Sequence, residues 1–217
     1  ALSRLQHEPE KYRDYYLKCV SLLAFLSMPL VVFMFLCTEQ LIVLLLGSQW
    51  LGAVDIFKIL AIASFIQPVS GTAGMVLIST GQSRLYLKLG VVSSVFICTS
   101  FVVGLPWGVK GVATGYALVN YLLLFPVLYY TFKNTAISIN YFNRTIFKPL
   151  MASLSMGVGF YLLIPTLANM NLILLLFIGF CFCALIYLLV FCLLPGGFSA
   201  LREYMSYGRL LYERKKQ

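Results

Sequence analysis

The chain has 217 residues, of which 61% are hydrophobic and 11% are charged, and its mean hydropathy is +0.92. Soluble domains are about 25% charged, so this composition excludes an ordinary soluble protein and indicates an integral membrane protein. The net charge is +9. Because the basic residues form short flanks between apolar runs, we interpret the charge first as a signal of membrane orientation and expect no nucleic-acid partner.

The apolar runs predict an all-α polytopic membrane bundle of about six transmembrane helices. We expect membrane spans at residues 19–37, 53–81, 84–104, 112–132, 149–167 and 172–194. Residues 1–18 are a polar, amphipathic and basic segment, interpreted equally well as a helix along the membrane face or as a solvated connector. Residues 41–50 are too short to cross a bilayer and predict a short helix that ends at Gly47. Residues 133–148 form a polar connector, and residues 199–217 form a basic tail.

The second span is the least lipid-like of the six. It is uncharged from Ile59 onward, Gln67 and Pro68 interrupt its middle, and small or hydroxylated residues follow. Proline leaves a backbone carbonyl unpaired, and inside a membrane that group needs a partner from another helix or from a water-filled cavity. This pattern predicts a broken helix that lines a polar interior.

Charged residues near two of the spans are candidates for a binding site. Asp55 and Lys58 lie one turn apart, where they form either a polar site for an anionic group or coupling ion, or a local ion pair near the interface. Arg84 and Lys88 share one helical face, where they either hold a phosphate at the cytoplasmic mouth or act as ordinary flanking charges.

Three polar residues inside the spans are further candidates. Gln67 shares a face of the second span with Ser64 and two glycines, which either line a pathway or allow tight packing. Tyr116 and Asn120 share a face of the fourth span. They form hydrogen bonds either to a ligand or to a neighbouring helix.

The residue inventory gives little support for catalysis. His7 is the single histidine and lies in a polar flank. We therefore expect neither a Ser/His/Asp triad nor a histidine metal site. The acidic residues are scattered, and no phosphate-binding glycine loop is present. The six cysteines form no C-x-x-C pair, and we expect free thiols. We therefore expect a protein that is not an enzyme and needs no metal or cofactor.

Lysine and arginine are distributed unequally between the two sides of the predicted topology. If residues 1–18 are cytoplasmic, alternation of six spans puts 14 of the 16 basic residues on that side. This bias predicts that both ends of the chain are cytoplasmic.

Four stretches resemble one bacterial family. They are ALSRLQHEPEKYRDYYLK before a span with a central Pro29, LLLGSQW at 44–50, ILAIASFIQPVSGTAGMVLISTGQS at 59–83, and GLPWGVKGVATGYAL at 104–118. Together they resemble the polysaccharide and lipopolysaccharide export proteins, which are oligosaccharide-lipid flippases of the multidrug/oligosaccharidyl-lipid/polysaccharide superfamily. The resemblance covers most of residues 1–150 and consists of diffuse patterns without a catalytic signature.

The resemblance implies a full protein about twice as long, with about 12 to 14 helices in two pseudosymmetric bundles around a central cavity. This chain would be the C-terminal part, with its N-terminal half missing. Residues 19–133 would complete a four-helix part of the second bundle, and residues 134–198 would be an additional helix pair. Such proteins move lipid-linked oligosaccharide across the inner membrane, and by position Lys58, Arg84 and Lys88 are the candidates to attract its diphosphate. Membrane lipids would surround the bundle.

Two other functions stay open at this point. A multidrug and toxin extrusion-type exporter has the same bundle plan and would be favoured by a carboxylate buried deep in the bundle. A non-transporting membrane scaffold for glycan synthesis would be favoured by a dry, tightly packed interior.

Overall fold

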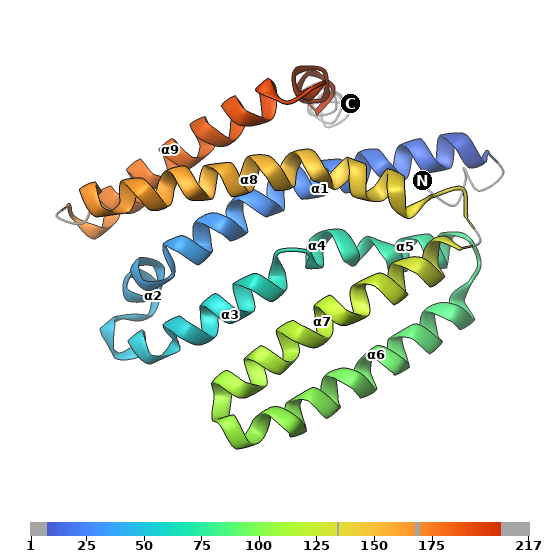
Figure 1. Ribbon diagram of the computed structural model, residues 1–217, viewed down its shortest axis with the longest axis horizontal. Helices are drawn as coiled ribbons and strands as arrows, with labels where there is room; N and C mark the ends of the chain where they lie inside the picture. The colour runs from blue at the N-terminus through green and yellow to red at the C-terminus, as the bar shows by residue number, and fades with distance from the viewer. Residues whose placement is uncertain (1–7, 134, 168–169, 205–217) are drawn as a thin grey trace, which may run out of the picture.

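The computed structural model describes residues 8–133, 135–167 and 170–204, and within these ranges the regular elements are all helices (Figure 1). The elements are α1 (Pro9–Leu36), α2 (Thr38–Leu46), η2 (Ser48–Ala53), α3 (Val54–Ser64), α4 (Gln67–Ser70), α5 (Thr72–Ser79), α6 (Ser83–Gly104), η3 (Leu105–Trp107), α7 (Gly108–Phe132), α8 (Ile139–Leu167) and α9 (Leu172–Leu193). Residues 197–204 form a further short helical segment.

Five helical stretches in this part of the chain are long and apolar enough to cross a membrane: Pro9–Leu36, Ser48–Ser79, Ser83–Phe132, Ile139–Leu167 and Leu172–Leu193. The third stretch turns back at η3, so that α6 and α7 form an antiparallel hairpin (Figure 1). This hairpin accounts for the difference between the five stretches and the six spans expected from sequence. The prediction of an all-α polytopic bundle is confirmed.

Two helices begin earlier than the sequence predicts. Helix α1 starts at Pro9, so residues 9–18 continue the first span instead of forming a separate connector; residues 1–7 lie outside the described ranges. Tertiary contacts explain this extension, because the hydroxyl groups of Tyr12 and Tyr16 form hydrogen bonds of 2.6 and 2.8 Å with Ser79 and Thr72 of α5. Helix α8 likewise starts at Ile139, within the predicted polar connector.

The predicted short helix is confirmed, and the third and fourth spans are joined by the short helix η3. Helix α2 ends at Gly47, whose φ of 93° lies in the left-handed region that favours glycine. Helices α6 and α7, which η3 connects, lie close together near Ser100 and Gly115. A Cβ atom at Gly115 would lie 3.0 Å from the carbonyl oxygen of Ser100, so only a small residue fits between the two backbones there.

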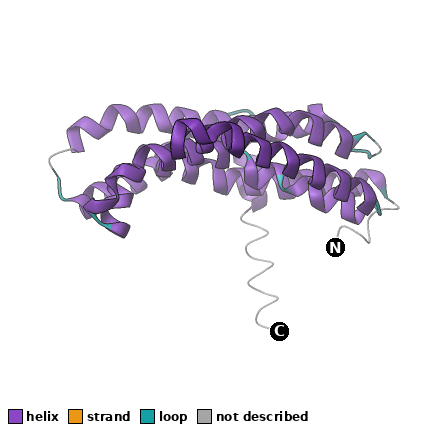
Figure 2. Ribbon diagram, turned by 90° about the horizontal axis from the view of Figure 1, so that it is seen from below, coloured by secondary structure: helices purple, strands orange, loops and turns teal. Residues whose placement is uncertain are grey.

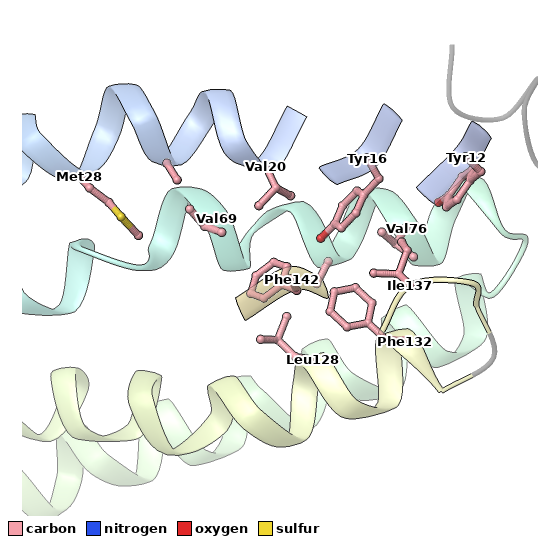
Figure 3. Close-up of a cluster of buried hydrophobic side chains, with 12 residues drawn as sticks. Tyr12, Tyr16, Val20, Met28, Val69, Val76, Leu128, Phe132, Ile137 and Phe142 are labelled. Atoms are coloured by element: carbon pink, nitrogen blue, oxygen red, sulfur yellow. The ribbon is translucent and has the colours of Figure 1, made fainter. Parts of the chain in front are cut away.

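One cluster of buried apolar side chains joins α1 to the middle of the bundle. Figure 3 shows Tyr16 and Val20 of α1 pointing toward Val69 of α4 and Val76 of α5, with Leu128 and Phe132 of α7 beside them. Phe142, near the start of α8, closes the cluster. This packing fixes the broken second span between α1 and α7.

A second buried cluster joins α1 to α8 and α9. Its centre is Phe160 of α8, which packs against the α9 backbone at Gly179 and against the ring of Phe33. Figure 2 shows that the helices together form a thin, arched slab. Many large apolar side chains on this slab are exposed, as expected for surfaces that face lipid or further helices.

Candidate functional site

The broken second span crosses the slab as three helices in sequence, α3, α4 and α5 (Figure 1). Pro68 stands in the first turn of α4, where its missing N–H costs no helical hydrogen bond. Beside the break, the hydroxyl of Tyr121 on α7 donates a 2.8 Å hydrogen bond to the carbonyl oxygen of Ile62. A carbonyl next to the break thus has a partner on another helix, which was one of the two alternatives; the polar interior stays a prediction.

A polar cluster lies at the same break. The Gln67 Nε2 donates a 2.7 Å hydrogen bond to the hydroxyl oxygen of Tyr116, and the Asn120 Nδ2 donates a 2.8 Å bond to the Tyr116 carbonyl oxygen. The structure thus brings Gln67 and Tyr116 together between α4 and α7, whereas the Asn120 amide bonds to a carbonyl one turn earlier on its own helix. Gln67 and Tyr116 form the interhelical hydrogen bond, which was one of the two alternatives; a role in ligand binding stays a prediction.

A local ion pair between Asp55 and Lys58 was one of two alternatives, and the structure pairs Asp55 with Lys110 instead. Asp55 Oδ2 lies 2.5 Å from the Nζ of Lys110, in the first turn of α7, and the two side chains are 59% and 62% exposed. Helices α3 and α7 pack side by side, so Lys110 reaches Asp55 across the interface. Sequence reasoning missed this partner because it placed Lys110 in a loop. Lys58 is half-buried and has no ion pair among the described side chains.

Arg84 and Lys88 lie in the first two turns of α6, where both are exposed and neither is ion-paired with another described residue. Helix α6 begins at the end of the slab where α1 begins, whereas α3 begins at the opposite end (Figure 1). Lys58 is therefore far along the bundle from the other two candidate cations. The three do not form a single cationic cluster within this chain.

Two hollows border the broken span and the hairpin. One, of about 440 Å³, lies between α1, α3, α7 and α8 and is almost entirely apolar, with Tyr121 on its wall. The other, of about 700 Å³, is an open groove along α6 and α7 that includes Lys110, Thr114 and Ser100. The groove thus contains Lys110 of the ion pair, but Asp55, Gln67 and Tyr116 do not line it.

Metal-binding residues do not gather in residues 8–133, 135–167 or 170–204, where no group of three or more His, Cys, Asp or Glu is close enough to hold an ion. The six cysteines are free, as predicted. His7 lies outside the described ranges.

Comparisons with known proteins point to glycan synthesis. A family model described as "Polysaccharide biosynthesis protein" matches residues 1–55, which include α1 and α2. The chain is similar to the teichuronic acid biosynthesis protein TuaB of Bacillus subtilis (strain 168), with 27% identity over 158 residues. The match covers 70% of this chain and 32% of TuaB, so it spans about a third of the length of that relative. No solved structure matches the chain significantly. The helices and the two similarities together support a multi-pass membrane protein with a role in polysaccharide synthesis or export.

Proposed function

We propose that the protein is part of a flippase that moves polyprenyl-diphosphate-linked oligosaccharide from the cytoplasmic to the outer leaflet of the bacterial inner membrane. The similarities to polysaccharide biosynthesis proteins support the class of substrate. In this proposal a second bundle of helices, which is not part of this chain, completes the cavity that holds the glycan headgroup.

The observation that carries the proposal is the broken second span. Membrane helices are interrupted where they border a polar pathway or another helix, and interrupted helices are common at the substrate sites of transporters. Here the interruption is held by two hydrogen bonds from α7, donated by Tyr121 and accepted by Tyr116. A span that faced only lipid would gain nothing from a glutamine, a proline and this hydrogen-bonded support.

The distribution of cations suggests separate roles for the candidate residues. Arg84 and Lys88 lie at the end of the slab where α1 and α6 begin, and the positive-inside rule makes that end cytoplasmic. We assign to them the capture of the diphosphate headgroup on the cytoplasmic side. Lys58 and Lys110, near the starts of α3 and α7, would meet the headgroup at the opposite end.

The exporter alternative is less well supported. It calls for a carboxylate buried deep in the bundle, whereas the buried polar side chains among the described residues are hydroxyls: Thr38, Thr72, Thr131 and Ser153. Asp55 is largely exposed and paired with Lys110.

The test replaces Arg84 and Lys88 together by glutamine in the full-length protein, in cells without another copy. We expect surface glycan to fall several-fold while the amount of protein in the membrane stays constant and lipid-linked oligosaccharide accumulates inside. The matched control is the Lys11→Gln/Lys133→Gln variant, which removes the same charge from the same end of the bundle at exposed positions.

Unchanged surface glycan in the Arg84/Lys88 variant and in a Lys58→Gln variant would contradict the site assignment. A scaffold role would instead reduce the amount of lipid-linked precursor, because synthesis and not transport would be impaired.

A further inference from the structure

A polar hollow, different from the two described above, lies away from the broken span at the end of the slab where α1 and α8 begin. It has a volume of about 380 Å³ and is enclosed by the early turns of α1 and α8, the end of α9 and the helical segment 197–204. This volume is within the range of pockets that bind small ligands. We call this hollow, which contains Lys18, Ser21, Arg144, Lys148, Glu203 and Tyr204, the α1–α8 pocket.

The α1–α8 pocket has an excess of positive charge. Its two acidic residues each face a basic side chain: Glu203 lies 2.6 Å from Lys18 Nζ, and Asp14 lies 3.0 Å from the guanidinium of Arg13. Arg144 and Lys148, one turn apart on α8, have no ion pair among the described residues. Two cations are therefore available to a ligand, which makes an anion the expected occupant.

The rest of the pocket is apolar and pre-formed. Leu17, Pro149 and Phe191 line its inner wall, and Pro149 and Phe191 are fully buried. The hydroxyl groups of Ser21 and Tyr204 are hydrogen-bonded to each other, which holds the segment 197–204 against α1. The ligand is thus expected to combine an anionic group with apolar parts.

The surroundings identify the source of such a ligand. Phe147 on α8 and Phe198 on the C-terminal segment are 55% and 64% exposed next to pocket-lining residues, so apolar surface continues outside the pocket. The pocket also lies near the ends of membrane-length helices, and lipid headgroups are expected near the ends of such helices. Basic pockets between transmembrane helices in this region are typical binding sites for anionic lipid headgroups.

We propose that the α1–α8 pocket binds the phosphate headgroup of an anionic membrane phospholipid through Arg144 and Lys148, with the acyl chains lying along the exposed apolar surface of α8. A bound headgroup would bridge α8 to the segment 197–204, which Lys18 and Glu203 already join to α1. The site is separate from the broken span, and the proposal does not depend on the flippase assignment.

The test measures binding of fluorescent phosphatidylglycerol to the purified full-length protein in a neutral detergent. We compare the wild type with the Arg144→Gln/Lys148→Gln variant and with the Lys11→Gln/Lys133→Gln control. We expect the pocket variant to bind roughly 10- to 30-fold more weakly, because each basic residue near an anionic lipid contributes on the order of a factor of five. The control variant is expected to bind like the wild type.

Three further arms fix the identity of the ligand. Phosphatidylcholine tests the requirement for negative charge, and glycerol phosphate and inorganic phosphate test the requirement for acyl chains. A charge-preserving Arg144→Lys/Lys148→Arg variant should retain binding, and it keeps the test valid if the glutamine variant does not fold. Equal affinity of the wild type and the glutamine variant for phosphatidylglycerol, or binding of phosphatidylcholine with equal strength, would overturn the proposal. Glycerol phosphate binding as tightly as the lipid would overturn the lipid assignment.

Discussion

The hydrogen bond between Gln67 and Tyr116 offers the sharpest test of how the broken span is held. Its length is 2.7 Å, and it joins α4 to α7. The Tyr116→Phe variant removes the hydroxyl while it keeps the ring, whose centroid lies 6.1 Å from that of Phe101. Interhelical hydrogen bonds in membrane proteins contribute about 0.6 kcal/mol on average and at most about 1.7 kcal/mol. We expect Tyr116→Phe and Gln67→Leu each to lower the free energy of unfolding by about 1 kcal/mol, because each also leaves a polar partner unpaired.

The double variant separates the bond from these side effects. If the bond exists, the loss in Gln67→Leu/Tyr116→Phe is smaller than the sum of the single losses by about 0.6 to 1.7 kcal/mol. The assay is reversible unfolding of the purified protein by increasing dodecyl sulfate in mixed micelles, followed by circular dichroism. Tyr129→Phe is the control, because Tyr129 is on the same helix and is 53% exposed. Additive losses within about 0.3 kcal/mol would refute the reasoning, as would an equal loss in the control.

Two further variants test the packing of α6 against α7 and of the segment 197–204 against α1. Gly115→Leu should destabilise the protein by about 1 to 3 kcal/mol, because its Cβ meets the Ser100 carbonyl oxygen, whereas Gly90→Leu on α6 has open space and should be neutral in the same unfolding assay. Burial raises the pKa of the Tyr204 hydroxyl, although its hydrogen bond with Ser21 acts in the opposite direction. The stability that this hydroxyl supplies is present below about pH 10, the pKa in the unfolded chain, and is lost as the pH rises through the raised value. The difference in unfolding free energy between the wild type and Tyr204→Phe should therefore shrink as the pH rises above about 10; a constant difference would contradict this account.

The candidate site was predictable only in part. Gln67, Tyr116 and Asn120 were identified by their polarity inside apolar runs, and the structure joins Gln67 to Tyr116 across two helices. The partner of Asp55 was not predicted, because a neighbour one turn away on the same helix is visible in a sequence and Lys110 on another helix is not. Tyr121 gave no signal, since nothing in its local sequence shows that its hydroxyl reaches the break.

Local sequence was enough to predict the helical class, the approximate positions of the membrane-length segments and the break in the second span. These properties depend on local chemistry, because an apolar run of sufficient length forms a helix in lipid, Gly47 ends α2 in the left-handed region, and Pro68 fits the first turn of a new helix. Tertiary structure alone decided which helices touch. The extension of α1 to Pro9 and the pairing of Asp55 with Lys110 both follow from packing between segments distant in sequence, and apolar lipid-facing helices carry little local information about their partners.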